Sequence, residues 1–152
     1  MAYRVLIVDD EEIVCRGMAQ FVRWEKCGFE VAGTAASVDE ALHMIRKVPI
    51  DVVFTDIRMP EKSGIDLLKE LNKEHPDIQG VVISGYSDFS YAKDAIRYGA
   101  VEYLSKPVNF AEMEALLRRI AEKLNKQYQE VRIHAYHMEG LLLSMARGYI
   151  ET

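Results

Sequence analysis

Apolar residues in the first two thirds of the chain fall into five short runs, each followed by a helical pattern. The runs are rich in β-branched and aromatic residues, which favours strands, whereas the segments between them repeat apolar residues every three or four positions. The predicted strands are Tyr3–Val8, Phe29–Ala35, Val52–Thr55, Val81–Ser84 and Val101–Leu104. Such alternation predicts a parallel sheet with right-handed crossovers and helices on both faces.

Two helix starts are marked in this pattern. Ser37 and Glu40 have the spacing of a capping box, and Asn109 can cap the helix that follows the last strand. Five strands with these connections allow the doubly wound α/β order 2-1-3-4-5. In that order ligands bind at the carboxyl ends of the strands, beside the switch point between the first and third strands.

The size and charge of the chain limit what it can be. Its 152 residues, 49% of them hydrophobic, suffice for one α/β core and a modest appendage. A net charge of −5 argues against a broad nucleic-acid-binding face. With no signal peptide or membrane span in the sequence, we expect no membrane association and a cytoplasmic location, where Cys15 and Cys27 stay reduced.

Three aspartates follow two strands that this topology makes neighbours. Asp9 and Asp10 come after the first strand and Asp56 after the third. Any one of them could simply begin a turn or a helix. Together they would place three like charges in one crevice, which costs free energy unless a cation neutralises them, and Mg²⁺ prefers such hard oxygen ligands.

A hydroxyl and an ammonium group follow the remaining two strands. Ser84 ends the fourth strand and Lys106 follows the fifth. Either could be an ordinary polar residue at a strand end. Combined with the carboxylates and a divalent cation they are typical of phosphoryl transfer, which depends mainly on positioning and charge neutralisation. This setting makes Asp56 the candidate nucleophile.

At this point the sequence resembles a bacterial response-regulator receiver domain (CheY-like, flavodoxin-type fold) over residues 3 to about 122. The resemblance rests on Asp9-Asp10, on TDIRMP around Asp56, on ISGY around Ser84 and on Lys106-Pro107. The stretches WEKCGFEVAGTA and SGYSDFSYAKDAIRYGAVEYLSKPV are similar to receivers joined to AraC-type DNA-binding domains. We therefore expect a receiver at 1–122 and a helical extension at 123–152.

The resemblance implies a role for each site residue. Asp56 would accept a phosphoryl group from a histidine kinase. Mg²⁺ would be bound by Asp10 and Asp56 directly, by Asp9 mainly through water, and by the backbone carbonyl of Arg58. The residues that would bind the phosphoryl group or respond to it are Ser84, Lys106, the switch aromatic Tyr103, and Pro107, which would follow a cis peptide bond.

Two bulky residues near the phosphoacceptor are candidates for tuning the lifetime of the acyl phosphate. Arg58 lies two positions after Asp56, and Tyr86 lies two positions after Ser84. Both are large enough to shield the acyl phosphate from water. Phosphorylation is expected to shift the face made by the fourth helix, fifth strand and fifth helix, because it adds negative charge that Ser84 and Lys106 must move to satisfy.

The helical pattern continues beyond the last strand to the end of the chain. Apolar residues recur at alternating steps of four and three, the spacing of a coiled-coil seam. The seam residues are Leu117, Ala121, Leu124, Tyr128, Val131, Ala135, Met138, Leu142, Met145 and Tyr149. One reading is a long helix that forms a parallel homodimer. The other is an amphipathic helix that packs on its own domain or on a missing one.

Three functions compete for this sequence. The chain could be the receiver of a longer transcription regulator, acting on DNA only through an absent output domain, and its end in a helical pattern favours this reading. It could instead be a stand-alone receiver that docks to a partner protein. A phosphatase of the haloacid-dehalogenase type needs an aspartate two residues after the nucleophile, where this chain has Arg58. We therefore expect a phosphoacceptor rather than an enzyme.

Overall fold

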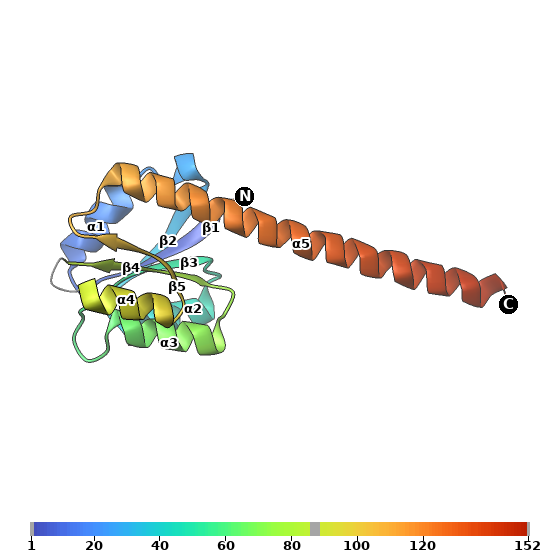
Figure 1. Ribbon diagram of the computed structural model, residues 1–152, viewed down its shortest axis with the longest axis horizontal. Coiled ribbons are helices and arrows are strands. Elements are labelled where there is room, and N and C mark those ends of the chain that lie inside the picture. The colour runs from blue at the N-terminus through green and yellow to red at the C-terminus, as the bar shows by residue number, and fades with distance from the viewer. Residues whose placement is uncertain (1, 86–88, 152) are drawn as a thin grey trace. The chain divides into compact units, whose positions relative to one another are not determined.

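The computed structural model describes residues 2–85 and 89–151, with residues 89, 91–92, 133–136 and 141–151 described by their backbone alone. Strands and helices alternate along the chain as the sequence predicts (Figure 1). The strands are β1 (Tyr3–Val8), β2 (Phe29–Ala35), β3 (Val52–Asp56), β4 (Gln79–Ser84) and β5 (Ala100–Ser105). The helices are α1 (Glu12–Phe21), the 3₁₀ turn η1 (Glu25–Cys27), α2 (Val38–Lys47), α3 (Gly64–Glu74), α4 (Phe89–Arg97) and α5 (Phe110–Glu151).

All five strands are parallel and lie in the order β2-β1-β3-β4-β5, which confirms the predicted doubly wound fold. Strands four and five begin one to two residues earlier than predicted, and strand three extends by one residue to include Asp56. Asp56 pairs in register with Ile83. The side chain at position 56 is therefore fixed by a central strand rather than by a loop.

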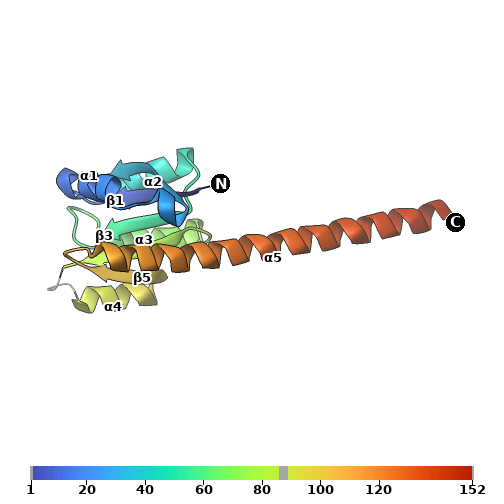
Figure 2. The same cartoon turned by 90° about the horizontal axis from the view of Figure 1, so that it is seen from above.

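Helices cover both faces of the sheet. Figure 1 shows α2, α3 and α4 on one side, with α1 and the first turns of α5 on the other, and Figure 2 views the sheet from this second side. The α2–α3 face buries an apolar cluster to which β1, β2, β3, α2 and α3 contribute. A second cluster on this face joins α3 and α4 to β4 and β5. Packing on both faces explains why β3 and β4 are entirely buried.

The helix starts agree with the sequence in part. The Ser37 hydroxyl accepts a hydrogen bond from the Glu40 N–H at 3.1 Å, but the Glu40 carboxylate bonds the N–H of Ala36 rather than that of Ser37. The Asn109 side chain caps α5 by accepting from two backbone N–H groups. The complete capping box is at α3 instead, where Ser63 and Asp66 bond each other's backbone N–H groups.

The chain divides into two compact units, residues 1–118 and residues 119–152. The first holds the sheet and its covering helices. The second is the continuation of α5, which is a single helix of 42 residues, as the long apolar repeat predicts. Among the side chains of this unit that the structure describes, the exposed large apolar ones are Tyr128, Val131 and Met138.

Candidate functional site

The polar residues singled out in the sequence lie at the carboxyl ends of four parallel strands, which meet at one edge of the sheet. Asp9 and Asp10 follow β1, Asp56 ends β3, and Ser84 ends β4. The fifth residue, Lys106, follows β5. Neighbouring strands thus deliver carboxylates from one side and an ammonium group from the other.

Local hydrogen bonds orient the buried carboxylate of Asp9. Its Oδ1 accepts from the N–H of Glu11 at 2.9 Å, which closes a turn at the entry to α1. The N–H of Asp9 donates to the carbonyl of Ala35 at 3.0 Å. The Cys15 thiol donates to the carbonyl of Asp9 at 3.4 Å from the first turn of α1. These contacts hold the loop between β1 and α1 against its neighbours.

Asp56 is almost as deeply buried as Asp9 and shares a cation with it. Oδ1 of Asp56 accepts from the N–H of Ile57 at 2.9 Å. The Lys106 ammonium lies 3.4 Å from Oδ2 of Asp56 and 3.5 Å from Oδ2 of Asp9. A single lysine therefore bridges the two carboxylates across the carboxyl edge of the sheet.

Burial and charge shift the titration of this group. Burial is the largest cause that raises the pKa of Asp9 and of Asp56 above the ordinary aspartate value, and neighbouring carboxylates add to it. Burial alone would lower the pKa of Lys106, but the charges of Asp56 and Asp9 outweigh it, so that pKa is raised. The lysine therefore stays charged. Ionising the two carboxylates costs free energy, because the single ammonium group does not fully offset their burial and their mutual repulsion.

The three aspartates are arranged as a metal site requires. One carboxylate oxygen from each of Asp9, Asp10 and Asp56 lies within 4.8 Å of the others. Asp9 and Asp56 are buried and Asp10 is exposed, so the group opens to solvent on one side. The donors are all hard oxygens, and the excess negative charge favours a divalent cation. The residues therefore fit the Mg²⁺ expected from the sequence.

Ser84 and Lys106 are tied to each other through the backbone. The N–H of Lys106 donates to the carbonyl of Ser84 at 2.8 Å, and Ser84 is 3% exposed. The peptide bond between Lys106 and Pro107 is cis. Ser84 thus lies at the same edge of the sheet as the carboxylates, at a fixed place beside the lysine.

The remaining predicted residues differ in how the structure places them. Tyr103 is half-buried on β5 and packs against the apolar cluster between α3, α4 and the sheet. Arg58 is exposed in the loop that follows Asp56. Tyr86 lies outside the described residues. The tuning role of Tyr86 stays a prediction.

Sequence reasoning missed two residues that contact the Asp56 backbone. The Thr55 hydroxyl, which is fully buried, donates to the carbonyl of Asp56 at 2.9 Å. The first residue of α3, Gly64, lies so close that an added Cβ would be 2.1 Å from the same carbonyl oxygen. The only sequence signal was the glycine itself, which marks a loop as readily as a close approach.

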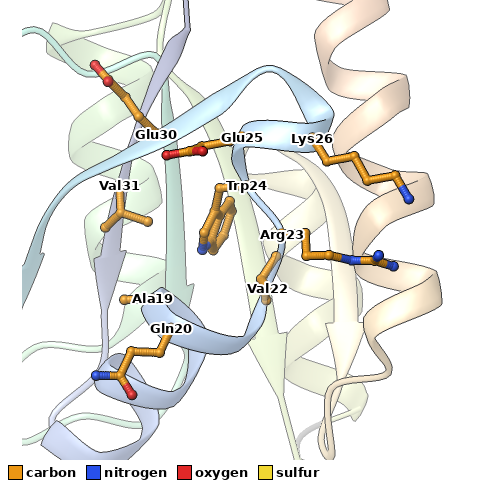
Figure 3. A pocket seen from close by; sticks show the side chains of 9 residues that line it. All are labelled: Ala19, Gln20, Val22, Arg23, Trp24, Glu25, Lys26, Glu30 and Val31. Atoms are coloured by element: carbon orange, nitrogen blue, oxygen red, sulfur yellow. The ribbon is translucent and has the colours of Figure 1, made fainter.

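A separate groove of about 560 Å³ lies between the end of α1, η1 and β2 (Figure 3). Its lining mixes apolar and charged side chains: Ala19, Gln20, Val22, Arg23, Trp24, Glu25, Lys26, Glu30 and Val31. None of the site aspartates is among them.

In the part of the chain that the structure describes, no helix is both long and apolar enough to cross a membrane.

Comparison with known proteins agrees with this geometry. Residues 5–118 match the family model of the response regulator receiver domain. The chain is 37% identical over 125 residues to the transcriptional regulatory protein YesN of Bacillus subtilis, covering 82% of this chain and 34% of YesN. It is 38% identical over 128 residues to the transcriptional regulatory protein HptR of Staphylococcus aureus, covering 84% of this chain and 50% of HptR. The chain thus spans between a third and a half of these relatives.

Solved structures show the same relationship. The receiver domain of AraT, a response regulator from Geobacillus stearothermophilus, has a TM-score of 0.79 and 34% identity, covering 84% of this chain and 99% of that one. The two-component transcriptional regulator AraC from Clostridium phytofermentans has a TM-score of 0.75 and 33% identity, covering 82% and 97%. The match over residues 5–118 takes in all but the first two residues of the sheet and the four loops that carry the site, so this chain belongs to the response regulator receiver domain family.

Proposed function

We propose that the chain receives a phosphoryl group on Asp56 from a sensor histidine kinase in the bacterial cytoplasm. The observation that carries this proposal is the Lys106 ammonium, which lies 3.4 Å from Asp56 and 3.5 Å from Asp9 within a group of three carboxylates. A buried carboxylate with an adjacent cation and an open, anionic flank suits transfer of a phosphoryl group. The proposed role is that of a phosphoacceptor and not of an enzyme that turns over a substrate.

In the proposed reaction, a carboxylate oxygen of Asp56 attacks the phosphorus of a phosphohistidine. The new bond joins this oxygen to phosphorus, the phosphorus–nitrogen bond breaks, and the histidine imidazole leaves with the electron pair. Oδ1 of Asp56 already accepts from the N–H of Ile57, so Oδ2, on the Lys106 side, is the better placed nucleophile. Lys106 stays protonated because the carboxylates raise its pKa, and it can pair with a phosphoryl oxygen.

Mg²⁺, when bound, would neutralise charge on the phosphoryl oxygens, and four groups of this chain would hold it. Asp10 and Asp56 would be direct ligands, Asp9 would act mainly through water, and the Arg58 backbone carbonyl would complete the set. The support is the convergence of the three carboxylates, whose oxygens lie within 4.8 Å of one another. Hard oxygen donors with room for water are the usual surroundings of this ion.

Ser84, Lys106 and Tyr103 would transmit the effect of phosphorylation to the rest of the domain. The phosphoryl group brings new acceptor oxygens, and the Ser84 hydroxyl would move to donate to one of them. The backbone bond between Lys106 and Ser84 couples the ends of β4 and β5. Tyr103, half-buried against α4, would turn inward when Ser84 moves. The output would be a two-state change of the face made by α4, β5 and α5.

The lifetime of the phosphorylated state would depend on shielding from water. Arg58, exposed two residues after Asp56, is one candidate, and Tyr86 is the second, on the strength of its sequence position alone. Measuring dephosphorylation rates of Arg58→Ala and Tyr86→Ala tests both. If a variant loses its phosphoryl group at the same rate as the parent chain, the substituted residue does not shield the acyl phosphate.

The output is proposed to be transcription regulation through a DNA-binding domain of AraC type outside this chain. The support is that the chain covers 34% of YesN and 50% of HptR, both transcriptional regulatory proteins, and resembles receivers of the regulators AraT and AraC. The alternative is a receiver that acts alone by docking to a partner protein. Gene expression from a fusion to an AraC-type domain, with and without Asp56, distinguishes the two.

The continuation of α5 is proposed to form a parallel homodimer. Tyr128, Val131 and Met138 lie on the seam predicted from the sequence, and between 46% and 66% of each is exposed. Gly140 lies within the helix and weakens it by about 1 kcal/mol, so the association should be modest. Sedimentation of Val131→Glu tests the seam, with Gln129→Glu as a control that adds the same charge two residues away. A parent chain that stays monomeric at all concentrations contradicts the dimer.

The phosphoacceptor itself is tested by intact mass after incubation with Mg²⁺ and a small acyl-phosphate donor. The parent chain should gain one phosphoryl group, and the gain should disappear on addition of EDTA and in Asp56→Asn. A folded parent chain that binds Mg²⁺ and gains no mass would rule out the proposal.

A further inference from the structure

The start of α3 lies directly against the peptide that follows the proposed phosphoacceptor. A Cβ added to Gly64 would stand 2.1 Å from the carbonyl oxygen of Asp56, 3.0 Å from its carbonyl carbon and 3.1 Å from the Cα of Ile57. All three atoms belong to the backbone, which cannot turn aside as a side chain can. Gly64 has no positive φ angle, so the need for glycine at this position is one of space.

Neither side of this contact can move easily. The start of α3 is held by the capping box of Ser63 and Asp66. Buried leucines of α3, of which Leu67 and Leu68 are the first, anchor the helix to the sheet. On the other side, Asp56 is paired with β4 in the centre of the sheet. The segment able to yield is the loop between them, residues 57–63.

That loop is also part of the proposed site. The N–H of Gly64 donates to the carbonyl of Ile57 at 2.8 Å and so closes the loop on itself. The Arg58 carbonyl, the proposed fourth ligand of Mg²⁺, is in this closed loop. A side chain at position 64 would push the loop outward, and both the Arg58 carbonyl and the Ile57 N–H that orients Asp56 would move with it.

We propose that Gly64 is a positioning residue for phosphoryl transfer: by lacking a side chain it lets α3 pack on the Asp56 peptide, which sets the direction of the Asp56 carboxylate and the place of the Arg58 carbonyl. The inference rests on the proposed function. Thr55 acts on the same atom, since its buried hydroxyl donates to the carbonyl of Asp56.

The test compares two glycine variants that create similar overlaps. In Gly64→Ala the new Cβ meets backbone beside Asp56, whereas in Gly80→Ala it meets the flexible end of Leu68 at 2.5 Å, near the amino end of β4. Both should lower the melting temperature. Only Gly64→Ala should also weaken Mg²⁺ binding, measured by titration calorimetry, by about tenfold, the effect typical of residues that orient metal ligands. Its phosphorylation by an acyl-phosphate donor should slow as well.

Two results would overturn the inference. The first is a folded Gly64→Ala chain with the Mg²⁺ affinity and phosphorylation rate of the parent, because its glycine would then serve stability alone. If Gly64→Ala does not fold, Thr55→Val decides instead, since it removes the hydroxyl without adding bulk. In that case, an unchanged Mg²⁺ affinity in Thr55→Val is the second result that would overturn the inference. A parent chain that neither binds Mg²⁺ nor accepts phosphate refutes the proposed function itself. This result comes from the parent chain alone and does not depend on either variant.

Discussion

Replacing Asp10 by asparagine should stabilise the protein without Mg²⁺ and destabilise it relative to the parent chain with Mg²⁺. The substitution keeps the shape of the side chain and removes one of three negative charges whose oxygens lie within 4.8 Å of one another. Asp10 is exposed, so the loss of its charge needs little rearrangement of the core. Its charge is one of the causes, after burial, that raise the pKa of Asp56.

The size of the effect follows from Coulomb's law. Two unit charges 4.8 Å apart repel by about 0.9 kcal/mol in a water-like dielectric and by about 3.5 kcal/mol at an effective dielectric constant of 20. Because Asp10 is exposed, the lower figure applies, and we expect Asp10→Asn to gain about 1 kcal/mol. For a chain of this length that raises the melting temperature by about 2–4 °C.

Mg²⁺ should reverse the order of thermal stability, so that the parent chain becomes more stable than Asp10→Asn. A ligand at one hundred times its dissociation constant stabilises the folded state by about 2.7 kcal/mol, which exceeds the gain from the substitution. The parent chain should receive this stabilisation, and Asp10→Asn, which lacks one ligand, should receive much less. Thermal melts with EDTA and with saturating Mg²⁺ measure both states.

An Asp10→Asn chain that melts below the parent chain in EDTA would contradict this prediction, because the three carboxylates would then not repel one another in the folded state. Stabilisation of both proteins by Mg²⁺ to the same extent would contradict it equally. Asp77→Asn, which alters an aspartate on the connection before β4, is a control for the removal of one negative charge.

Three further predictions concern the lysine, the pH and the cysteines. Lys106→Met should slow phosphorylation by an acyl-phosphate donor by about 100-fold, as for the loss of one charge-stabilising donor, and a change below threefold would exclude a direct role. Because burial raises the pKa of Asp9 and Asp56, Mg²⁺ binding should weaken on acidification at a higher pH than the titration of an ordinary aspartate would give; a calorimetric affinity that falls only in the range of an ordinary aspartate would contradict the shift. Cys15 is buried, which raises the pKa of its thiol to about 11, and Cys27 is buried too, so a thiol reagent at pH 8 should label neither until the protein unfolds; labelling of either thiol in the folded protein would contradict this.

The sequence was sufficient to predict the fold and to place most candidate residues, because both depend on where strands end. In a parallel sheet, a polar residue directly after an apolar run must lie at the carboxyl edge. That rule alone brought Asp9, Asp56, Ser84 and Lys106 to one edge. It needed no knowledge of side-chain conformations.

Local sequence patterns could not predict features that depend on how separate parts of the chain pack together. The capping box of α3 was missed because its second member is Asp66, whereas the sequence pattern expects glutamate or glutamine. The early start of β4 was missed because Gly80 has a low strand propensity, and its burial on both faces overrides that preference. The close approach of Gly64 to Asp56 depends on how α3 lies on the sheet, which no local pattern specifies.

Phosphorylation of Asp56 is tested most directly by identifying the residue that carries the phosphoryl group. Borohydride reduces an aspartyl phosphate to homoserine, so phosphorylation with an acyl-phosphate donor and Mg²⁺, followed by reduction, digestion and mass spectrometry, marks the modified position. We expect homoserine at position 56 and at no other aspartate. Phosphorylation with homoserine at Asp9 or Asp10 and none at position 56 would contradict this expectation.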